Sequence, residues 1–327
     1  MKPKIKDVAK LANVSETTVS RVLNNRGYIS SETREKVENA MKELNYFPND
    51  IARSLFNKKT NLIGLILPTT QNPFFGELAF HIERLCNSLG YKILLCNSLN
   101  DVATEKKYLE MLMRNQVDGI IVGTHNQGIS DYENQNLAIV SIDTYLSENI
   151  PIISSDNYLG GKLATELLIS KGCKNIINID GEFILKTQAR LRKKAYEDVM
   201  KKYGMKAITY EVVHTFKHED QVQIANKILK EHPEVDGIFA TNDLFAAAFI
   251  NQARKYGKRI PEDVKVIGYD GTETCLSFLP ELSTVKQPIE LIAKRSIDML
   301  IKGINNKFYE KNIKEILPVE ILVKETT

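Results

Sequence analysis

PKIKDVAKLANVSETTVSRVLN, residues 3–24, carries two short apolar patterns with helical spacing, one on each side of a break at residues 13–15. The apolar positions are Ile5, Val8, Leu11 and Ala12 in the first pattern and Val19, Val22 and Leu23 in the second. Ser15 is a favoured N-cap residue, so a second helix is expected to begin at Glu16. Two helices joined by so tight a turn are typical of a helix-turn-helix unit.

A third helix is expected after Ser30 or Ser31, because either residue can cap it. Its apolar positions are Val37, Ala40, Met41 and Leu44. With this brace, the second helix would present its polar side chains to the major groove of duplex DNA. There Arg21 can form two hydrogen bonds to one guanine, and Glu16 can accept a hydrogen bond from the amino group of cytosine. A surface helix of a small bundle is the alternative interpretation of the same pattern.

The distribution of charge favours the interpretation as a DNA reader. Residues 1–60 contain twelve Lys or Arg against seven Asp or Glu, a net charge of +5. The whole chain carries only +3, so the remaining residues together carry −2. A basic head on a slightly acidic body is the arrangement that attraction to DNA phosphates requires.

Four motifs of the head together resemble the lac repressor/gal repressor family of bacterial transcriptional regulators. They are VAKLANVS at residues 8–15, TVSRVLN at 18–24, NYFPN at 45–49 and ARSL at 52–55. Within that family, four other sequence segments make the chain most similar to the sucrose operon repressors. These segments are MKPK at residues 1–4, NPFFGEL at 72–78, NQVDGII at 115–121 and YLSENIP at 145–151.

The resemblance implies a homodimer that binds a pseudo-palindromic operator in double-stranded DNA. It also implies that a hinge follows the head, with Leu55 inserted into the minor groove at the operator centre. A helix as short as 49–57 is marginal alone in water, so its folding is expected to accompany DNA binding. An ordinary interdomain linker is the alternative. The implied DNA-binding residues are Glu16, Thr17, Thr18, Ser20, Arg21, Asn24, Tyr28, Asn49, Ala52, Arg53 and Leu55.

The body that follows alternates short apolar runs with longer amphipathic segments. The expected strands are 62–68, 92–97, 119–123, 138–143, 176–179, 208–213, 237–240 and 264–268. The expected helices are 75–89, 104–114, 160–170, 189–202, 220–230 and 244–256. This alternation predicts an α/β fold with parallel, doubly wound sheets. Residues 116–122 also echo residues 234–240, which indicates two lobes of similar build, as in periplasmic binding proteins.

The final stretch is expected to return to both lobes, with a helix at 289–303 and strands within 315–323. The predicted organisation is a helix-turn-helix DNA-binding domain at 1–47, a hinge helix and linker at 48–60, and an effector-binding core at 61–327. Within the core, the N-lobe is expected at about 61–154 and 288–316, and the C-lobe at about 155–287 and 317–327. A length of 327 residues is consistent with two or three domains.

Ligands of open α/β sheets bind beyond the carboxyl ends of the strands, and polar residues gather there in this chain. Asp143 ends one predicted strand, and Asn242 and Asp270 follow two others. Carboxylate, amide and guanidinium groups bond vicinal hydroxyls, so a sugar or other polyol suits this set. Turn and helix capping is the alternative role for each residue. The resemblance implies that the effector contacts are Phe74, Asp143, Arg192, Phe216, Asn242 and Asp270.

No catalytic constellation is apparent, so an enzyme is not expected. Gly161-Lys162 lacks the first glycine and the Ser or Thr of a phosphate-binding loop, and no GxGxxG follows the first strand. No HExxH or GxSxG motif is present, and the four cysteines lack the spacing of a zinc site. No cofactor and no metal are therefore expected. The apolar runs are too short for a membrane span and no signal peptide is recognisable, so a cytoplasmic location is expected.

The resemblance thus implies a repressor of a sucrose-type sugar operon that a sugar or sugar-phosphate inducer releases from its operator. We expect the dimer to form through the lobe faces, with the predicted helix at 75–89 included. One alternative is a family member with a corepressor such as a purine, and another is one with a phosphocarrier-protein partner. A sugar-binding protein without a DNA role and an enzyme with a regulatory head are further alternatives.

Overall fold

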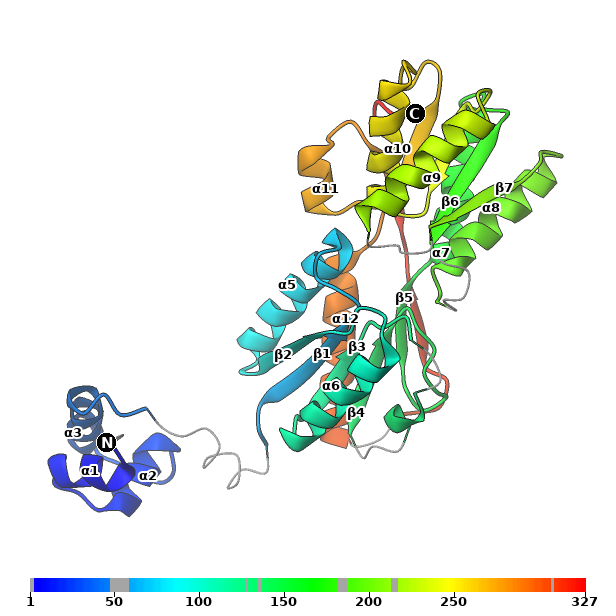
Figure 1. The fold of residues 1–327 in the computed structure, drawn as a ribbon. Coiled ribbons are helices and arrows are strands. Elements are labelled where there is room, and N and C mark those ends of the chain that lie inside the picture. The colour runs from blue at the N-terminus through cyan, green and yellow to red at the C-terminus, as the bar shows by residue number, and fades with distance from the viewer. Residues whose placement is uncertain are drawn as a thin grey trace. The chain divides into compact units, whose positions relative to one another are not determined.

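The computed structural model describes residues 3–47, 59–126, 129–133, 137–181, 187–212, 217–306 and 309–327. Its contacts divide the chain into two units, residues 1–60 and residues 61–327. Figure 1 shows the first unit as helices alone and the second as two lobes, each with a sheet and covering helices. The expected fold class, a helical head followed by two parallel α/β sheets, is confirmed.

The head consists of three helices, α1 (Ile5–Leu11), α2 (Glu16–Leu23) and α3 (Ser31–Glu43). Their buried side chains form one apolar cluster of Val8, Ala9, Ala12, Val19, Val22, Val37 and Ala40. The hydroxyl of Ser15 caps α2 by accepting from the backbone N–H of Thr18 at 3.1 Å. Ser30, and not Ser31, caps α3. Leu11 was expected in the apolar stripe but is 43% exposed, because Ala9 completes the buried face of this short helix instead.

Replacing Ser15 with alanine is expected to lower the stability of the head by about 1 kcal/mol, since α2 loses its cap. In the full chain, hydrogen exchange of the α2 amides should then accelerate about fivefold. Ser31→Ala is the matched control, because Ser31 lies at the start of α3 while the neighbouring Ser30 carries the cap. Equal exchange in the Ser15 and Ser31 variants would contradict the capping role.

The first sheet of the body lies in the N-lobe and is parallel throughout. Among the described residues its strands are β1 (Leu62–Leu67), β2 (Lys92–Asn97), β3 (Gly119–Val122), β4 (Ala138–Ile142), β5 (Ile152–Ser155) and β11 (Lys314–Leu317), in the order β11-β5-β4-β3-β1-β2. Helices α5 (Pro73–Ser88) and α12 (Ile289–Asn306) cover one face. Helix α6 (Val102–Arg114) and the 3₁₀ turn η1 (Ser130–Tyr132) pack on the other.

The second sheet lies in the C-lobe and repeats this plan. Its described strands are β6 (Ile176–Gly181), β7 (Ile208–Val212), β8 (Gly237–Ala240), β9 (Lys265–Asp270), β10 (Ser283–Lys286) and β12 (Glu320–Leu322), in the order β12-β10-β9-β8-β6-β7. Only the β10–β12 pair of these is antiparallel. Helices α7 (Asn157–Ser170) and α8 (Arg190–Lys202) cover one face, and α9 (His218–Glu231) and α10 (Asp243–Lys255) cover the other. The short helix α11 (Glu273–Phe278) follows β9.

Within the described residues the chain passes between the two sheets three times, after β5, after β10 and after β11. The last strands of the chain therefore complete both sheets, one each. The sequence pattern does not predict β5, β10 or α11, because segments of four to six residues are too short to show a period. In the described part of the chain, no helix is both long and apolar enough to cross a membrane.

Candidate functional site

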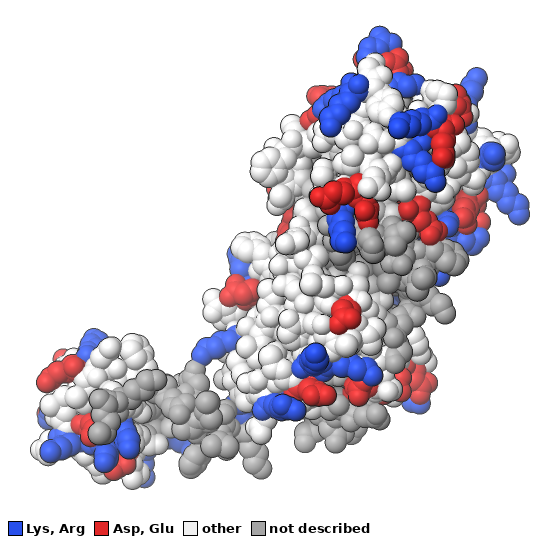
Figure 2. Space-filling view, in the orientation of Figure 1, with Lys and Arg blue, Asp and Glu red and all other residues white. Residues whose placement is uncertain are grey.

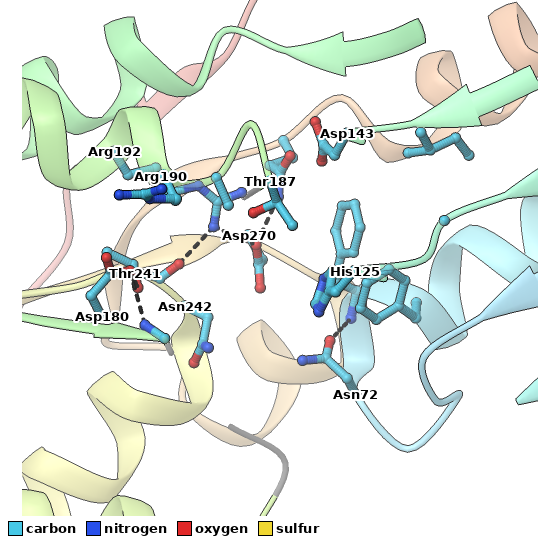
Figure 3. Close-up of a pocket in the computed structure, with 17 residues that line it drawn as sticks. Asn72, His125, Asp143, Asp180, Thr187, Arg190, Arg192, Thr241, Asn242 and Asp270 are labelled. Atoms are coloured by element: carbon cyan, nitrogen blue, oxygen red, sulfur yellow. Dashed lines mark hydrogen bonds and ion pairs between the residues drawn. The ribbon is translucent and has the colours of Figure 1, made fainter. Parts of the chain in front are cut away.

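A cleft opens between the two sheets, at the carboxyl ends of their strands. Its empty volume is about 910 Å³ with the open solvent at its mouth included. Figure 3 shows Asp180, Thr241 and Asn242 on one side of this space and His125 and Asn72 on the opposite side. The described lining residues are Asn72, Phe74, Phe75, Gly123, His125, Ile142, Asp143, Asp180, Gly181, Thr187, Ala189, Arg190, Arg192, Thr241, Asn242, Asp270 and Gln287.

Arg192, on the first turn of α8, is the most constrained cation of the cleft. Its Nε donates to Oδ1 of Asn157 at 2.7 Å, and its Nη1 donates to the backbone oxygen of Thr241 at 2.6 Å. The guanidinium also lies 3.6 Å from the ring centre of Tyr269, a cation–π contact. Because the side chain is only 7% exposed, these contacts fix it against the cleft wall.

Asp270 is the last residue of β9 and pairs with Arg192. Oδ1 of the carboxylate lies 3.6 Å from the Arg192 Nη1 and accepts from Nε2 of Gln287 at 2.7 Å. Burial raises the pKa of Asp270 to about 6, against the opposing effect of the Arg192 charge. The backbone of Asp270 has a φ of +116°, a strained conformation that turns the chain sharply where the strand ends.

Two further carboxylates, Asp143 and Asp180, lie at the ends of strands of different sheets. Oδ1 of Asp143 accepts from the Ser154 hydroxyl at 2.6 Å and from the Asn157 amide at 3.3 Å. Oδ1 of Asp180 accepts from the Thr241 hydroxyl at 3.0 Å and from the backbone N–H of Gly181 at 2.9 Å. Burial raises the pKa of both carboxyls, while these hydrogen bonds oppose the shift.

The N-lobe side of the cleft supplies aromatic rings. Phe74 and Phe75 lie on the first turn of α5 with their ring centres 5.2 Å apart, and Phe75 lies 5.7 Å from His125. Burial lowers the pKa of His125 to about 4, and the nearby Arg192 charge adds to this effect. His125 is therefore a neutral ring near pH 7.

Gly161 on α7 allows Arg192 to reach its position. A Cβ at Gly161 would lie 2.4 Å from the backbone oxygen of Arg192, so α7 and α8 could not approach as closely with any other residue. This accounts for the glycine of Gly161-Lys162, which in the sequence only partly matches a phosphate-binding loop.

The structure brings together five of the six predicted effector residues, namely Phe74, Asp143, Arg192, Asn242 and Asp270. Phe216 lies outside the described residues. Asn242 also caps α10 by accepting from the backbone N–H of Phe245 at 2.8 Å, so its capping role is observed and its effector contact stays a prediction. Asp180, next to the last residue of β6, and Thr241, directly after β8, also lie at strand ends, so the same rule applies to them. Nothing in the sequence pattern singles out His125, Asn157 or Gln287.

The predicted DNA-binding residues of the head fall into two sets. Glu16, Thr17, Arg21 and Tyr28 are exposed, and Tyr28 is exposed at 97%. Thr18, Ser20 and Asn24 are half-buried and take part in local hydrogen bonds, such as that of the Asn24 amide with the backbone oxygen of Ser20 at 2.8 Å. Figure 2 shows Lys and Arg side chains interspersed with Asp and Glu on the visible face of the head. The predicted hinge contacts Asn49, Ala52, Arg53 and Leu55 lie outside the described residues.

No cluster of three or more His, Cys, Asp or Glu side chains in the described part of the chain could hold a metal ion. The cysteines are free thiols, with Cys86, Cys96 and Cys173 buried. Burial raises the pKa of Cys86 to about 12, so this thiol is protonated near pH 7.

The chain is similar to known regulators over its full length. Residues 4–49 match the model for bacterial regulatory proteins of the lacI family, and residues 165–327 match the periplasmic binding protein-like domain. The sucrose operon repressor of Pediococcus pentosaceus is 44% identical over 98% of each chain. The ribose operon repressor of Halalkalibacterium halodurans is 41% identical over 99% of this chain and 96% of its own.

Two solved structures show the same architecture. The lac repressor dimer bound to operator and the anti-inducer ONPF superposes with a TM-score of 0.86 at 27% identity, over 100% of this chain and 99% of its own. A periplasmic binding protein/LacI transcriptional regulator from Alkaliphilus metalliredigens, complexed with D-xylulofuranose, superposes with a TM-score of 0.75. It is 34% identical over 82% of this chain and 99% of its own. The present chain belongs to the lacI family of bacterial regulatory proteins.

Proposed function

We propose that the chain represses a sucrose-type sugar operon and that a sugar bound in the cleft releases it from the operator. The observation that carries this proposal is the convergence of Asp143, Arg192, Asn242 and Asp270 on one space between the lobes. Sucrose and ribose operon repressors among the relatives, and the D-xylulofuranose complex of the A. metalliredigens regulator, support a sugar as the ligand. A repressor acts where the bacterial chromosome lies, so we place the chain in the cytoplasm.

The chemistry of the cleft suits the hydroxyl groups of a sugar. Carboxylate oxygens of Asp143 and Asp270 accept from hydroxyls, and the Asn242 amide can both donate and accept. Phe74 and Phe75 provide apolar surface for the C–H face of a sugar ring. Because these groups come from both lobes, a bound sugar would favour one relative arrangement of the lobes over others.

In this proposal the exposed side chains of α2 read the operator in the major groove. Arg21 and Glu16 face solvent on this helix, and each can bond a base edge. The minor-groove contacts expected of Ala52, Arg53 and Leu55 remain a prediction, as does a hinge helix at 48–60. The lac repressor structure is a dimer, and we infer that this chain also dimerises, with α5 in the interface. Sugar and operator then oppose each other reciprocally, by about 1–3 kcal/mol.

Binding of the full chain to a palindromic DNA fragment tests this function. The affinity should fall steeply as salt rises, since Lys and Arg side chains displace the counterions of the phosphates. Addition of sucrose, fructose or ribose should then release the fragment for at least one of these sugars. A scrambled fragment of equal length is the control. Binding that shows no preference for the palindrome, or no release by any sugar, would count against the proposal.

Sugar affinity is expected to fall as the pH drops from about 7.5 to about 5.5. The pKa of Asp270 is raised to about 6, so acid neutralises a carboxylate that pairs with Arg192 and accepts from the ligand. Burial also raises the pKa of Asp143 and of Asp180. His125 stays neutral over this range, since its pKa is about 4.

Calorimetric titration of the sugar across this range measures the effect, which reaches at most about tenfold per pH unit for each proton taken up. Circular dichroism at each pH confirms that the fold is intact. A flat affinity profile would show that the Asp270 carboxyl does not change its ionisation in this range.

A further inference from the structure

Asp143, Asp180 and Asp270 share one arrangement in the cleft. In each, the protein contacts the Oδ1 atom. Oδ1 of Asp143 accepts hydrogen bonds from Ser154 and Asn157, and Oδ1 of Asp180 accepts from Thr241 and Gly181. Oδ1 of Asp270 accepts from Gln287 and pairs with Arg192. The described residues provide no hydrogen bond to Oδ2 of any of the three. All three residues line the cleft, so each has one acceptor oxygen left for a ligand.

Among the described lining residues of the cleft, the positively charged groups do not outnumber the carboxylates. Among the described lining residues, three carboxylates face two guanidinium groups, those of Arg190 and Arg192. Arg192 already donates hydrogen bonds to Asn157 and Thr241, pairs with Asp270 and lies over the ring of Tyr269. His125 adds no charge near pH 7, because its pKa is lowered to about 4.

A sugar hydroxyl and a sugar phosphate interact with open carboxylate oxygens in opposite ways. A hydroxyl donates its hydrogen to a carboxylate oxygen, which gives a strong, charge-assisted bond. A phosphate monoester carries nearly two negative charges near pH 7 and its oxygens act as acceptors. Open carboxylate oxygens therefore attract the first ligand and repel the second, and burial in a medium of low dielectric strengthens both effects.

We propose that the effector is an uncharged sugar and that Asp180 is a specificity-determining residue that rejects its phosphorylated form. The proposal rests on the proposed function, because it assumes that the cleft binds a sugar. The Asp180 carboxylate, like that of Asp143, has no cationic partner within 4 Å among the described residues, whereas Asp270 pairs with Arg192. Among the described side chains, the Thr241 hydroxyl is the one hydrogen-bond donor to the Asp180 carboxylate, whereas Ser154 and Asn157 both donate to that of Asp143.

Asp180→Asn isolates this charge with little change in shape. Oδ1 of the new amide can still accept from the Thr241 hydroxyl and the Gly181 N–H, as the carboxylate does. The amide nitrogen then takes the place of Oδ2, so an acceptor becomes a donor that suits a phosphate. Asp198→Asn is the matched control, because it removes the same charge from the outer side of α8, where Asp198 pairs with Lys194.

The test is calorimetric titration of the full-length protein with sucrose, fructose and ribose and with a phosphate monoester of each. In the natural protein, the sugar that releases the operator should bind at least about tenfold more tightly than its monoester. Asp180→Asn should weaken binding of the sugar and strengthen binding of the monoester. The ratio of the sugar affinity to the monoester affinity should therefore fall by about tenfold or more. Asp198→Asn should leave the ratio unchanged.

Tighter binding of a monoester by the natural protein would overturn the proposal, as would an unchanged ratio in Asp180→Asn with its thermal unfolding intact. Both results leave the proposed function standing, because a sugar or its ester still binds in the cleft. Failure of every sugar and every ester to bind, in a chain that binds the palindrome, would instead overturn the sugar-dependent function itself.

Discussion

Replacing Arg192 with alanine is expected to abolish release of the operator by sugar while operator binding itself persists. The change removes the hydrogen bonds to Asn157 and Thr241 and leaves Asp270 buried without its cation. Truncating one partner of a buried charge pair at a binding site costs about 2–5 kcal/mol. Sugar affinity should therefore fall by roughly 30-fold or more.

Fluorescence anisotropy of a labelled operator, with and without sugar, measures both properties of the Arg192 variant. Lys194→Ala, on the same helix, is the control, because the Lys194 side chain is 59% exposed and pairs with Asp198. Thermal unfolding of the variant, followed by circular dichroism, shows whether residues 61–327 are still folded. Normal release by sugar would exclude Arg192 from the binding site.

Val37→Asp is expected to have the reverse effect, with operator binding lost and sugar binding kept. Val37 is fully buried in the apolar cluster of the head, and an unpaired carboxylate there costs several kcal/mol. The three short helices share this one small cluster, so the head should unfold. Operator affinity should fall by roughly 1,000-fold or more, to the level of nonspecific binding.

Sugar titration of the Val37 variant should be unchanged, because residues 61–327 form a separate unit with their own cores. Asn39→Asp is the matched control, since it introduces the same residue and charge two positions away on the exposed side of α3. Loss of sugar binding in Val37→Asp would show that the two units depend on each other for folding. Comparable loss of operator binding in both variants would assign the effect to charge instead of packing.

The parts of the structure that depend on local signals could be predicted from the sequence. Ser15 before an apolar period indicates where α2 begins, and long alternating segments indicate the parallel sheets. Leu11 shows the limit of this approach, because seven residues of α1 are too few to define which side is buried. The rule that ligands bind at strand ends placed Asp143 and Asp270 correctly in the cleft.

The partners of the site residues could not be predicted in the same way. Asn157 and Gln287 lie where the chain passes between the sheets, and they contact Arg192 and Asp270, which are distant in sequence, only in the folded structure. His125 lies in the connection after β3, where no period exists. Its neutral state depends on burial and on Arg192, which is distant in sequence. Such contacts are products of tertiary structure and carry no local signal.

The return of the last strands to both sheets has a consequence for synthesis of the protein. β5 pairs with β11 and β10 pairs with β12, so each sheet lacks one edge until residues 314–322 have been made. Translation proceeds from the N-terminus, and the head can fold from its own local contacts long before that point. Until residues 314–322 have been made, both lobes have unpaired strand edges, which favour association with other chains. We therefore expect the nascent chain to gain its DNA-reading head first and its sugar-responsive cleft last.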